Sequence, residues 1–279
     1  YMCAKLFMKI LFTVCLLSAN FAIIAQEENR ATLAVLPFIT REGVRIDVNN
    51  QTLIPQMVET QFTSLVCESL VKSRKFNMLE RDYLRKVLAE NKITESEWSK
   101  PGEEQRIGKL LVADYLVIGH IDSEVPLKPL KRPVNIELTG EKTFEEIWDL
   151  KVHFHVTEVK SGKMVFAHSL SNKLKSRDIP GRERKDMTPD DYILMLYSKT
   201  AIEAANSILE GIYPIKVASV SGDEVVLNRG EGSGLNPGMI YNVFNIGESV
   251  KDPDTGASLG AEEIKVGQIE ISSIQPKFS

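Results

Sequence analysis

The chain has few cysteines, no excess of positive charge and no long hydrophobic run beyond its first residues. Its 279 residues include three cysteines, 17 glycines and 12 prolines, with 34 lysines and arginines against 38 aspartates and glutamates. The modest glycine and proline content excludes collagen-like and low-complexity classes. The net charge of −4 argues against a general nucleic-acid-binding protein. A hydrophobic content of 43% predicts a globular protein with one large core or two smaller ones.

The apolar run at residues 10–25 follows Lys9 and stops where polar sequence begins at Gln26. It is shorter than the roughly 20 residues that a membrane-spanning helix needs. A basic residue, a short apolar run and a small residue at its end, Ala25, are typical of a secretory signal peptide. We therefore predict a cleaved signal peptide over residues 1–25 and export to the periplasm, with a retained membrane anchor as the alternative.

Cleavage after Ala25 would remove Cys3 and Cys15 and leave Cys67. A chain with one cysteine has no intrachain disulfide, so its core must stabilise the fold. The residues before Cys15 lack the leucine and small side chains that lipoprotein processing requires, so we do not expect lipid attachment there. Cys67 lies in a predicted helix and is interpreted as a buried small hydrophobe.

Strand and helix patterns alternate in the first half of the mature chain. An almost uninterrupted apolar run at residues 32–39 predicts a strand that is buried on both faces. Helical spacing follows at 54–71, and the later segments are a strand at 76–79, helices at 81–90 and 103–111, and a strand at 115–121. Alternating strands and helices predict an α/β arrangement in layers.

The second half begins with a predicted hairpin at residues 150–168, with one face buried, and continues into a polar loop from Lys173 to Asp186. Thr188 and Pro189 open a predicted helix as its N-cap and first residue, and Gly211 is expected to end it. Beyond residue 214, short β segments separated by glycine-rich turns predict a small all-β domain over residues 214–279.

Three stretches, residues 33–38, 76–90 and 108–119, resemble in order and spacing the CsgG family, the curli-production assembly/transport component and its relatives. The resemblance covers residues 32–211. It implies an α/β domain, an α+β sandwich related to the N-terminal domain of TolB and to periplasmic activators of peptidoglycan synthases. Motifs between residues 227 and 256 resemble the C-terminal domain of the flagellar assembly protein FlgT.

The CsgG resemblance implies a cell-envelope protein that binds and assembles rather than catalyses. The founding member is a lipoprotein that forms an oligomeric outer-membrane secretion pore, to which each subunit contributes two β-hairpins. Here the corresponding inserts, residues 122–146 and 168–186, carry prolines such as Pro126 and Pro133 and many charges. Proline has no backbone N–H to donate to a neighbouring strand, and charged side chains are costly on the lipid face of a barrel. We therefore expect both inserts to be soluble loops, which argues against a pore.

Histidines and glycines suggest other sites. His153 and His155 lie on one face of a predicted strand and His168 on the next, so that three imidazoles could meet at a metal, but we expect solvent-facing side chains and no metal. Gly230–Gly234 lies between β segments and is interpreted as a turn rather than a phosphate loop. Residues 252–256 are likewise interpreted as a turn rather than a calcium loop.

No catalytic motif is evident, and no cofactor is expected. A basic loop is the one candidate partner-binding segment, and the alternative is a solvated loop. Its residues are Lys173, Lys175, Arg177, Arg182, Arg184 and Lys185.

The sequence therefore predicts a non-enzymatic periplasmic or outer-membrane-associated assembly or accessory factor for secretion or surface-structure biogenesis. The expected partners are envelope or secretion-machine proteins, a second copy of the chain or the outer-membrane surface, and not nucleic acid. One alternative is an oligomeric outer-membrane secretion pore for curli-like subunits. The other is an enzyme whose site linear sequence does not reveal.

Overall fold

The computed structural model describes residues 30–40, 46–48, 51–53, 55–98, 100, 102–122, 130–135, 142–180, 186–256 and 258–279. The predicted signal peptide at residues 1–25 lies outside this part of the chain.

The described α-helices agree closely with the sequence periodicity. They are α2 (Pro55–Lys72), α3 (Arg81–Glu90), α4 (Glu103–Leu110) and α6 (Pro189–Ile212). Thr188 caps α6 as predicted, because its side chain and backbone N–H both bond to the Asp191 carboxylate, each at 2.7 Å. None of the described helices is long and apolar enough to cross a membrane.

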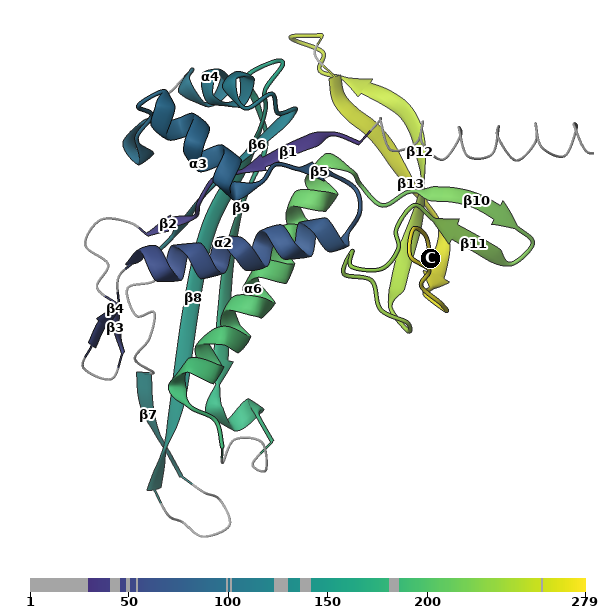
Figure 1. Ribbon diagram of the computed structural model, residues 1–279. Coiled ribbons are helices and arrows are strands. Elements are labelled where there is room, and N and C mark those ends of the chain that lie inside the picture. Colours follow the sequence, from purple (N-terminus) through teal and green to yellow (C-terminus); the bar gives the residue numbers. More distant parts are fainter. Residues whose placement is uncertain are drawn as a thin grey trace, which may run out of the picture.

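The main sheet has the strand order β5-β1-β6-β8-β7, with β2 paired to β6 and β9 paired to β8 (Figure 1). Strands β1, β5 and β6 run parallel, whereas β8 runs antiparallel to β6, β7 and β9. The strands are β1 (Thr32–Val35), β2 (Ile39–Thr40), β5 (Asn77–Met78), β6 (Tyr115–Ile121), β7 (Leu130–Asn135), β8 (Lys142–Glu158) and β9 (Lys163–Lys175). A separate short pair, β3 (Ile46–Val48) and β4 (Gln51–Leu53), precedes α2.

Helices pack on both faces of this sheet and make three layers (Figure 1). Leu33 and Val35 of β1 join the core under α2 and α6, while Ala34 and Leu36 join the core under α3 and α4. All four side chains are buried, because successive strand residues point to opposite faces. This confirms the mixed α/β arrangement and the two-faced burial of the first strand.

Two expected loops are instead partly strands. The insert at residues 122–146 contains β7 and the start of β8, and Pro133 lies opposite Phe144 in their ladder. The insert at 168–186 contains the end of β9 and a short 3-10 helix, η2 (Ser176–Asp178). Proline is tolerated here because β7 is an edge strand. The loop prediction was therefore wrong for these residues, while residues 123–129, 136–141 and 181–185 lie outside the described chain.

Gly211 does not end α6, which continues to Ile212. A Cβ atom at Gly211 would lie 2.4 Å from the Phe166 ring of β9. Glycine is present here because the helix approaches the sheet closely, and not because the chain turns. The expected helix stop was therefore wrong, because α6 includes Gly211 and ends one residue later.

The C-terminal part consists of two β-hairpins. They are β10 (Val217–Ser221) with β11 (Glu224–Leu227), and β12 (Ile240–Lys251) with β13 (Ser258–Glu270). A small apolar cluster of Leu227, Leu235 and Ile271 holds them together. The hairpins agree with an all-β composition, and a separate domain over 214–279 stays a prediction.

Arg229 joins this part to the α/β layers. Its side chain is fully buried, and its Nη2 donates to the carbonyl oxygens of Leu209, at 3.4 Å, and of Tyr213. The guanidinium thereby satisfies acceptors at the C-terminal end of α6, where a positive charge also complements the helix dipole. Burial lowers the pKa of Arg229 from its ordinary value.

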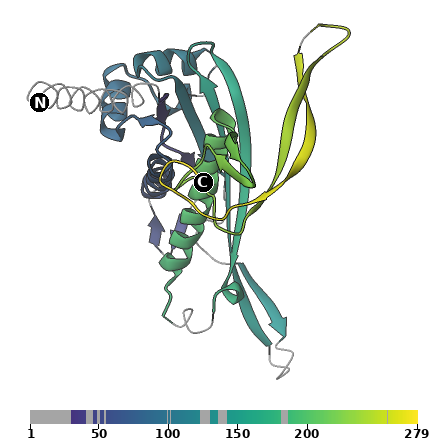
Figure 2. The same cartoon turned by 90° about the vertical axis from the view of Figure 1, so that its right-hand side faces the viewer.

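The β12–β13 hairpin projects from the body, and Figure 2 shows it in yellow reaching away from the helices. Its exposed apolar side chains include Ile246, 71% exposed, and Val266, 62% exposed. An isolated two-stranded hairpin is only marginally stable in water. Contact with another molecule would bury these apolar side chains and stabilise the hairpin.

Gly119→Ala is expected to lower the free energy of unfolding by about 1–3 kcal/mol, because the new Cβ would lie 2.2 Å from the buried Phe38 ring. Thermal unfolding followed by circular dichroism measures the change. Gly267→Ala is the matched control, since it also lies in a strand but has no atom within 4 Å of the new Cβ. Equal effects of the two substitutions would contradict the packing argument.

Candidate functional site

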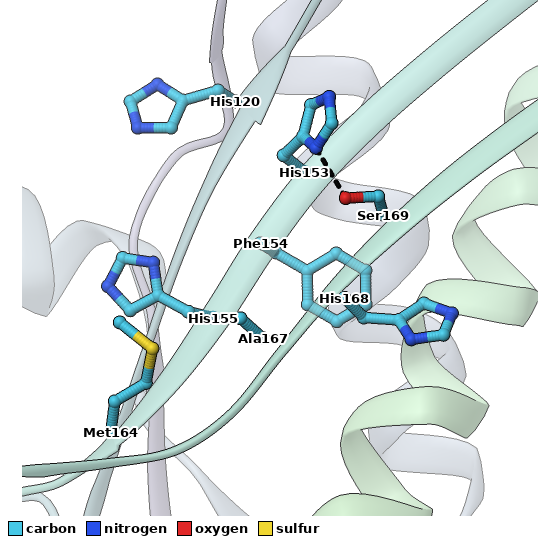
Figure 3. Close-up of a pocket in the computed structure, with 8 residues that line it drawn as sticks. All are labelled: His120, His153, Phe154, His155, Met164, Ala167, His168 and Ser169. Atoms are coloured by element: carbon cyan, nitrogen blue, oxygen red, sulfur yellow. Dashed lines mark hydrogen bonds between the residues drawn. The ribbon is translucent and has the colours of Figure 1, made fainter.

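Three histidines gather on the sheet face that also carries α3 and α4. His120 of β6 lies opposite His153 of β8, and His155 follows on the same face. They line an open pocket of about 340 Å³ together with Met164 and Ser169 of β9, among others (Figure 3). Successive side chains of a strand point to opposite faces of the sheet. Because Leu150, Val152 and Phe154 of β8 face the core under α2 and α6, His153 and His155 face the side of α3 and α4.

His168 also lines this pocket, but its imidazole does not point toward the other three histidines. It lies opposite Phe154 in the β8–β9 ladder, with ring centroids 6.0 Å apart, and Figure 3 shows it pointing the other way, toward α6. The alternative in which the imidazoles of His153, His155 and His168 meet is therefore not the arrangement in the structure. Among the described residues, no group of three or more His, Cys, Asp or Glu side chains is placed to hold a metal ion.

His153 and His155 each contact a carboxylate. The Nε2 of His153 lies 2.5 Å from Asp122 Oδ2, at the end of β6, and its Nδ1 lies 2.6 Å from Ser169 Oγ. The Nε2 of His155 lies 3.2 Å from Glu104 Oε1 on α4, and Thr157 donates to the same carboxylate. These contacts join α4, β6, β8 and β9 across long stretches of sequence.

The chain Ser169–His153–Asp122 has the connectivity of a nucleophile, a base and an orienting acid. Acyl transfer also needs hydrogen-bond donors that are positioned to bind an oxyanion, and these are often backbone N–H groups that are not already paired with a neighbouring strand. Here Ser169 and His153 lie in paired strands, and the His153 side chain is 44% exposed. The contacts connect Ser169 of β9, through His153 of β8, to Asp122 directly after β6.

Two basic residues near the other end of β8, Arg177 and Lys173, are paired with acids. Arg177 Nε lies 2.6 Å from Glu145 Oε1, and Lys173 Nζ lies 3.6 Å from Asp149 Oδ2. The Glu145 side chain is only 2% exposed, whereas Arg177 is 59% exposed. Lys173 and Lys175 belong to β9 and Arg177 to η2, so the described members are not a loop. Arg182, Arg184 and Lys185 lie outside the described residues.

The two glycine-containing motifs are turns, as predicted. The segment Gly230–Gly234 packs against Lys72 at the end of α2 and against Asn206 of α6. At residues 252–256, Asp252 Oδ1 accepts hydrogen bonds from the backbone N–H of Thr255 at 2.8 Å and of Asp254 at 2.9 Å. These donors lower the pKa of Asp252, which stabilises the turn between β12 and β13.

Cys67 is partly buried against the core beneath α2 and α6, consistent with its interpretation as a small hydrophobe. Burial raises the pKa of its thiol to about 11, and the nearby Arg81 opposes this shift only in part. The thiol is therefore protonated at neutral pH and is a poor nucleophile.

Sequence reasoning missed Glu104, Asp122 and Ser169, which contact the histidines. Glu104 is separated from His155 by 51 positions and from Thr157 by 53. No spacing rule connects positions so far apart, because the contacts exist only after α4 packs on the sheet.

Residues 30–123 match the family model of the curli production assembly/transport component CsgG. The match confirms the predicted CsgG resemblance over the segment that contains β1, β6 and helices α2 to α4. It ends before the C-terminal hairpins, so the FlgT resemblance stays a prediction. No curated protein matches the chain.

Solved structures with similarity to the chain include the hypothetical protein CT253 from Chlamydia trachomatis. It is 12% identical, with 66% of this chain and 98% of that chain covered at a TM-score of 0.43. The LpoB C-terminal domain from Salmonella enterica is 10% identical, with 51% and 82% covered at 0.33. TolB from Acinetobacter baumannii is 10% identical, with 85% and 50% covered at 0.32. Similarities this distant carry no inference about function.

Arg177→Met is expected to lower the free energy of unfolding by about 2–4 kcal/mol, because it leaves the buried Glu145 carboxylate without a counter-charge. The double substitution Arg177→Met with Glu145→Leu should recover most of this loss. Lys173→Met is the matched control and should cost less than about 1 kcal/mol, since Asp149 is partly exposed. Urea denaturation measures all three, and an equal cost for Arg177→Met and Lys173→Met would show that the Arg177–Glu145 pair is not structural.

Cys67 is expected to react slowly with a thiol reagent at neutral pH, because its raised pKa of about 11 leaves little thiolate. In a chain without residues 1–25, labelling should accelerate as the pH approaches 11 or when denaturant unfolds the protein. Mass spectrometry measures the rate, with Cys67→Ser as the blank. Rapid labelling of the folded protein at neutral pH would contradict the burial of this thiol.

Proposed function

We propose that the protein is an exported, non-enzymatic cell-envelope protein that serves as an assembly or accessory factor for secretion or surface-structure biogenesis. The observation that carries this proposal is the CsgG family match over residues 30–123. That segment supplies side chains to both cores of the sheet, while β8, β9 and α6 lie outside the match.

The exposed hairpins support a function in binding. Leu130 and Phe144 are 65% and 64% exposed on the β7–β8 hairpin, and β12–β13 carries a second group of exposed apolar side chains. Apolar groups gathered on projecting elements are typical of surfaces that contact other proteins. Partners among envelope or secretion-machine proteins, a second copy of the chain and a peripheral contact with the outer membrane are all consistent with the proposal.

An oligomeric outer-membrane secretion pore is the second candidate function. One observation favours it: strands β7, β8 and β9 form extended hairpins at both inserts where the sequence predicted loops. Pro133 and the buried Glu145 lie within the β7–β8 hairpin and oppose it, as does Arg177, which pairs with Glu145 from η2 directly after β9.

Expression of the full chain in a Gram-negative host, followed by fractionation and sizing, separates these functions. We expect the protein to leave with the osmotic-shock fraction or to be washed from membranes by salt, and to elute as a monomer or small oligomer. A chain without residues 10–25 is the matched control and should remain in the cytoplasm, because it lacks the export signal.

Two outcomes contradict the proposal. Retention of the full chain in the cytoplasm would overturn the assignment to the envelope. Extraction only by detergent, followed by elution as a large ring, would replace the accessory role with the pore.

A further inference from the structure

We infer that the groove between β11 and β13 binds an extended, lysine- or arginine-rich segment of a partner polypeptide by strand addition. The groove encloses about 470 Å³ and is lined by residues of both strands and by the last residues of the chain. This inference goes beyond the proposed function and does not depend on it, since it concerns the C-terminal hairpins outside the CsgG match.

Each strand that lines the groove has one edge with which no other described strand pairs. Among the described strands, β11 pairs only with β10, and β13 pairs only with β12. A free edge presents unpaired N–H and C=O groups to an incoming strand. Two free edges that line one groove offer main-chain partners on both sides of a bound segment.

The β11 edge already accepts main chain at one end. Leu227 donates its N–H to the carbonyl of Ser279 at 2.7 Å and accepts from the Ser279 N–H at 3.4 Å. Because alternate residues of a strand direct their backbone groups to the same edge, the N–H and C=O of Val225 also face the groove. A bound segment would therefore continue the pairing that Ser279 begins.

The opposite wall is arranged in the same way. Ile271 donates its N–H to Met239 O and accepts from Gly238 N, each at 2.8 Å, so its backbone groups face β12. The backbone groups of the preceding residue, Glu270, consequently face away from β12 and into the groove.

The charge of the groove indicates which kind of segment binds there. The charged side chains that line the groove, Asp223, Glu224 and Glu270, are all acidic. Phe278 also lines the groove and is 49% exposed, so it offers an apolar surface to the aliphatic stem of a lysine or arginine. A second copy of this chain would bring the same acidic β11 edge, so we assign the groove to a basic segment of another protein.

Binding can be measured by fluorescence anisotropy of the full chain with a labelled octapeptide of alternating lysine and threonine. We expect saturable binding that weakens as salt is added. Glu270→Lys and Glu224→Lys should each weaken it by about two- to fivefold, as expected for the loss of an exposed ion pair. Glu262→Lys is the matched control, because it makes the same charge change on β13 outside the groove, and it should leave the affinity unchanged.

A second peptide tests the main-chain contacts without altering the protein. Methylation of alternate backbone nitrogens removes donors from one edge of the peptide but keeps its charge, and it should weaken binding roughly tenfold. Val225→Pro removes the corresponding donor from β11 and should also weaken binding, with circular dichroism to confirm that the fold is retained.

Three results would overturn the inference. The first is the absence of saturable binding. The second is equal weakening by Glu262→Lys and Glu270→Lys, which would show that only overall charge matters. The third is equal affinity for the methylated and unmethylated peptides, which would exclude strand addition. The fractionation result for the proposed function leaves all three measurements unaffected.

Discussion

The structure depends on the burial of β1 and β6 on both faces between two helical layers. Leu33 and Val117 contribute to the core under α2 and α6, and Ala34 and Leu116 contribute to the core under α3 and α4. Each fully buried valine or leucine stabilises the fold by about 1.5–3 kcal/mol relative to an exposed side chain. The other strands of the main sheet are aligned from this pair, because β5 pairs with β1, β2 and β8 pair with β6, and β8 in turn pairs with β7 and β9.

Buried charged side chains connect the C-terminal hairpins and the far end of β8 to the rest of the structure. Arg229 occupies the end of α6 and connects the C-terminal hairpins to the α/β layers, while Glu145 and Arg177 connect the far end of β8 to η2. Arg229 donates to carbonyl oxygens at the end of α6, and Arg177 provides a counter-charge for the buried Glu145, so displacing either arginine would remove a partner from a buried polar group. The projecting hairpins are thus attached firmly at their bases while their outer surfaces stay open to partners.

Sequence reasoning succeeded where one local pattern determines an element. Helix α3 spans the predicted residues 81–90, and the Thr188 cap begins α6, because periodicity and capping chemistry act over a few residues. It failed at the inserts, where prolines and charges locally indicate a loop, and at Gly211, where a glycine locally indicates the end of a helix. Strand pairing with β8 and close contact with Phe166 override that local preference.

By itself, the sequence determined the alternation of helices and strands, the buried faces of the central strands and the resemblance to CsgG, which the family model confirms over residues 30–123. Tertiary structure alone decided that His168 turns away from His153, that Glu104 and Asp122 meet the histidines, and that β11 and β13 line one acidic groove. The physical reason is the distance along the sequence over which each kind of interaction acts. Periodicity and capping arise between neighbours in the chain, whereas these contacts form between positions that only the folded sheet and its packed helices bring together.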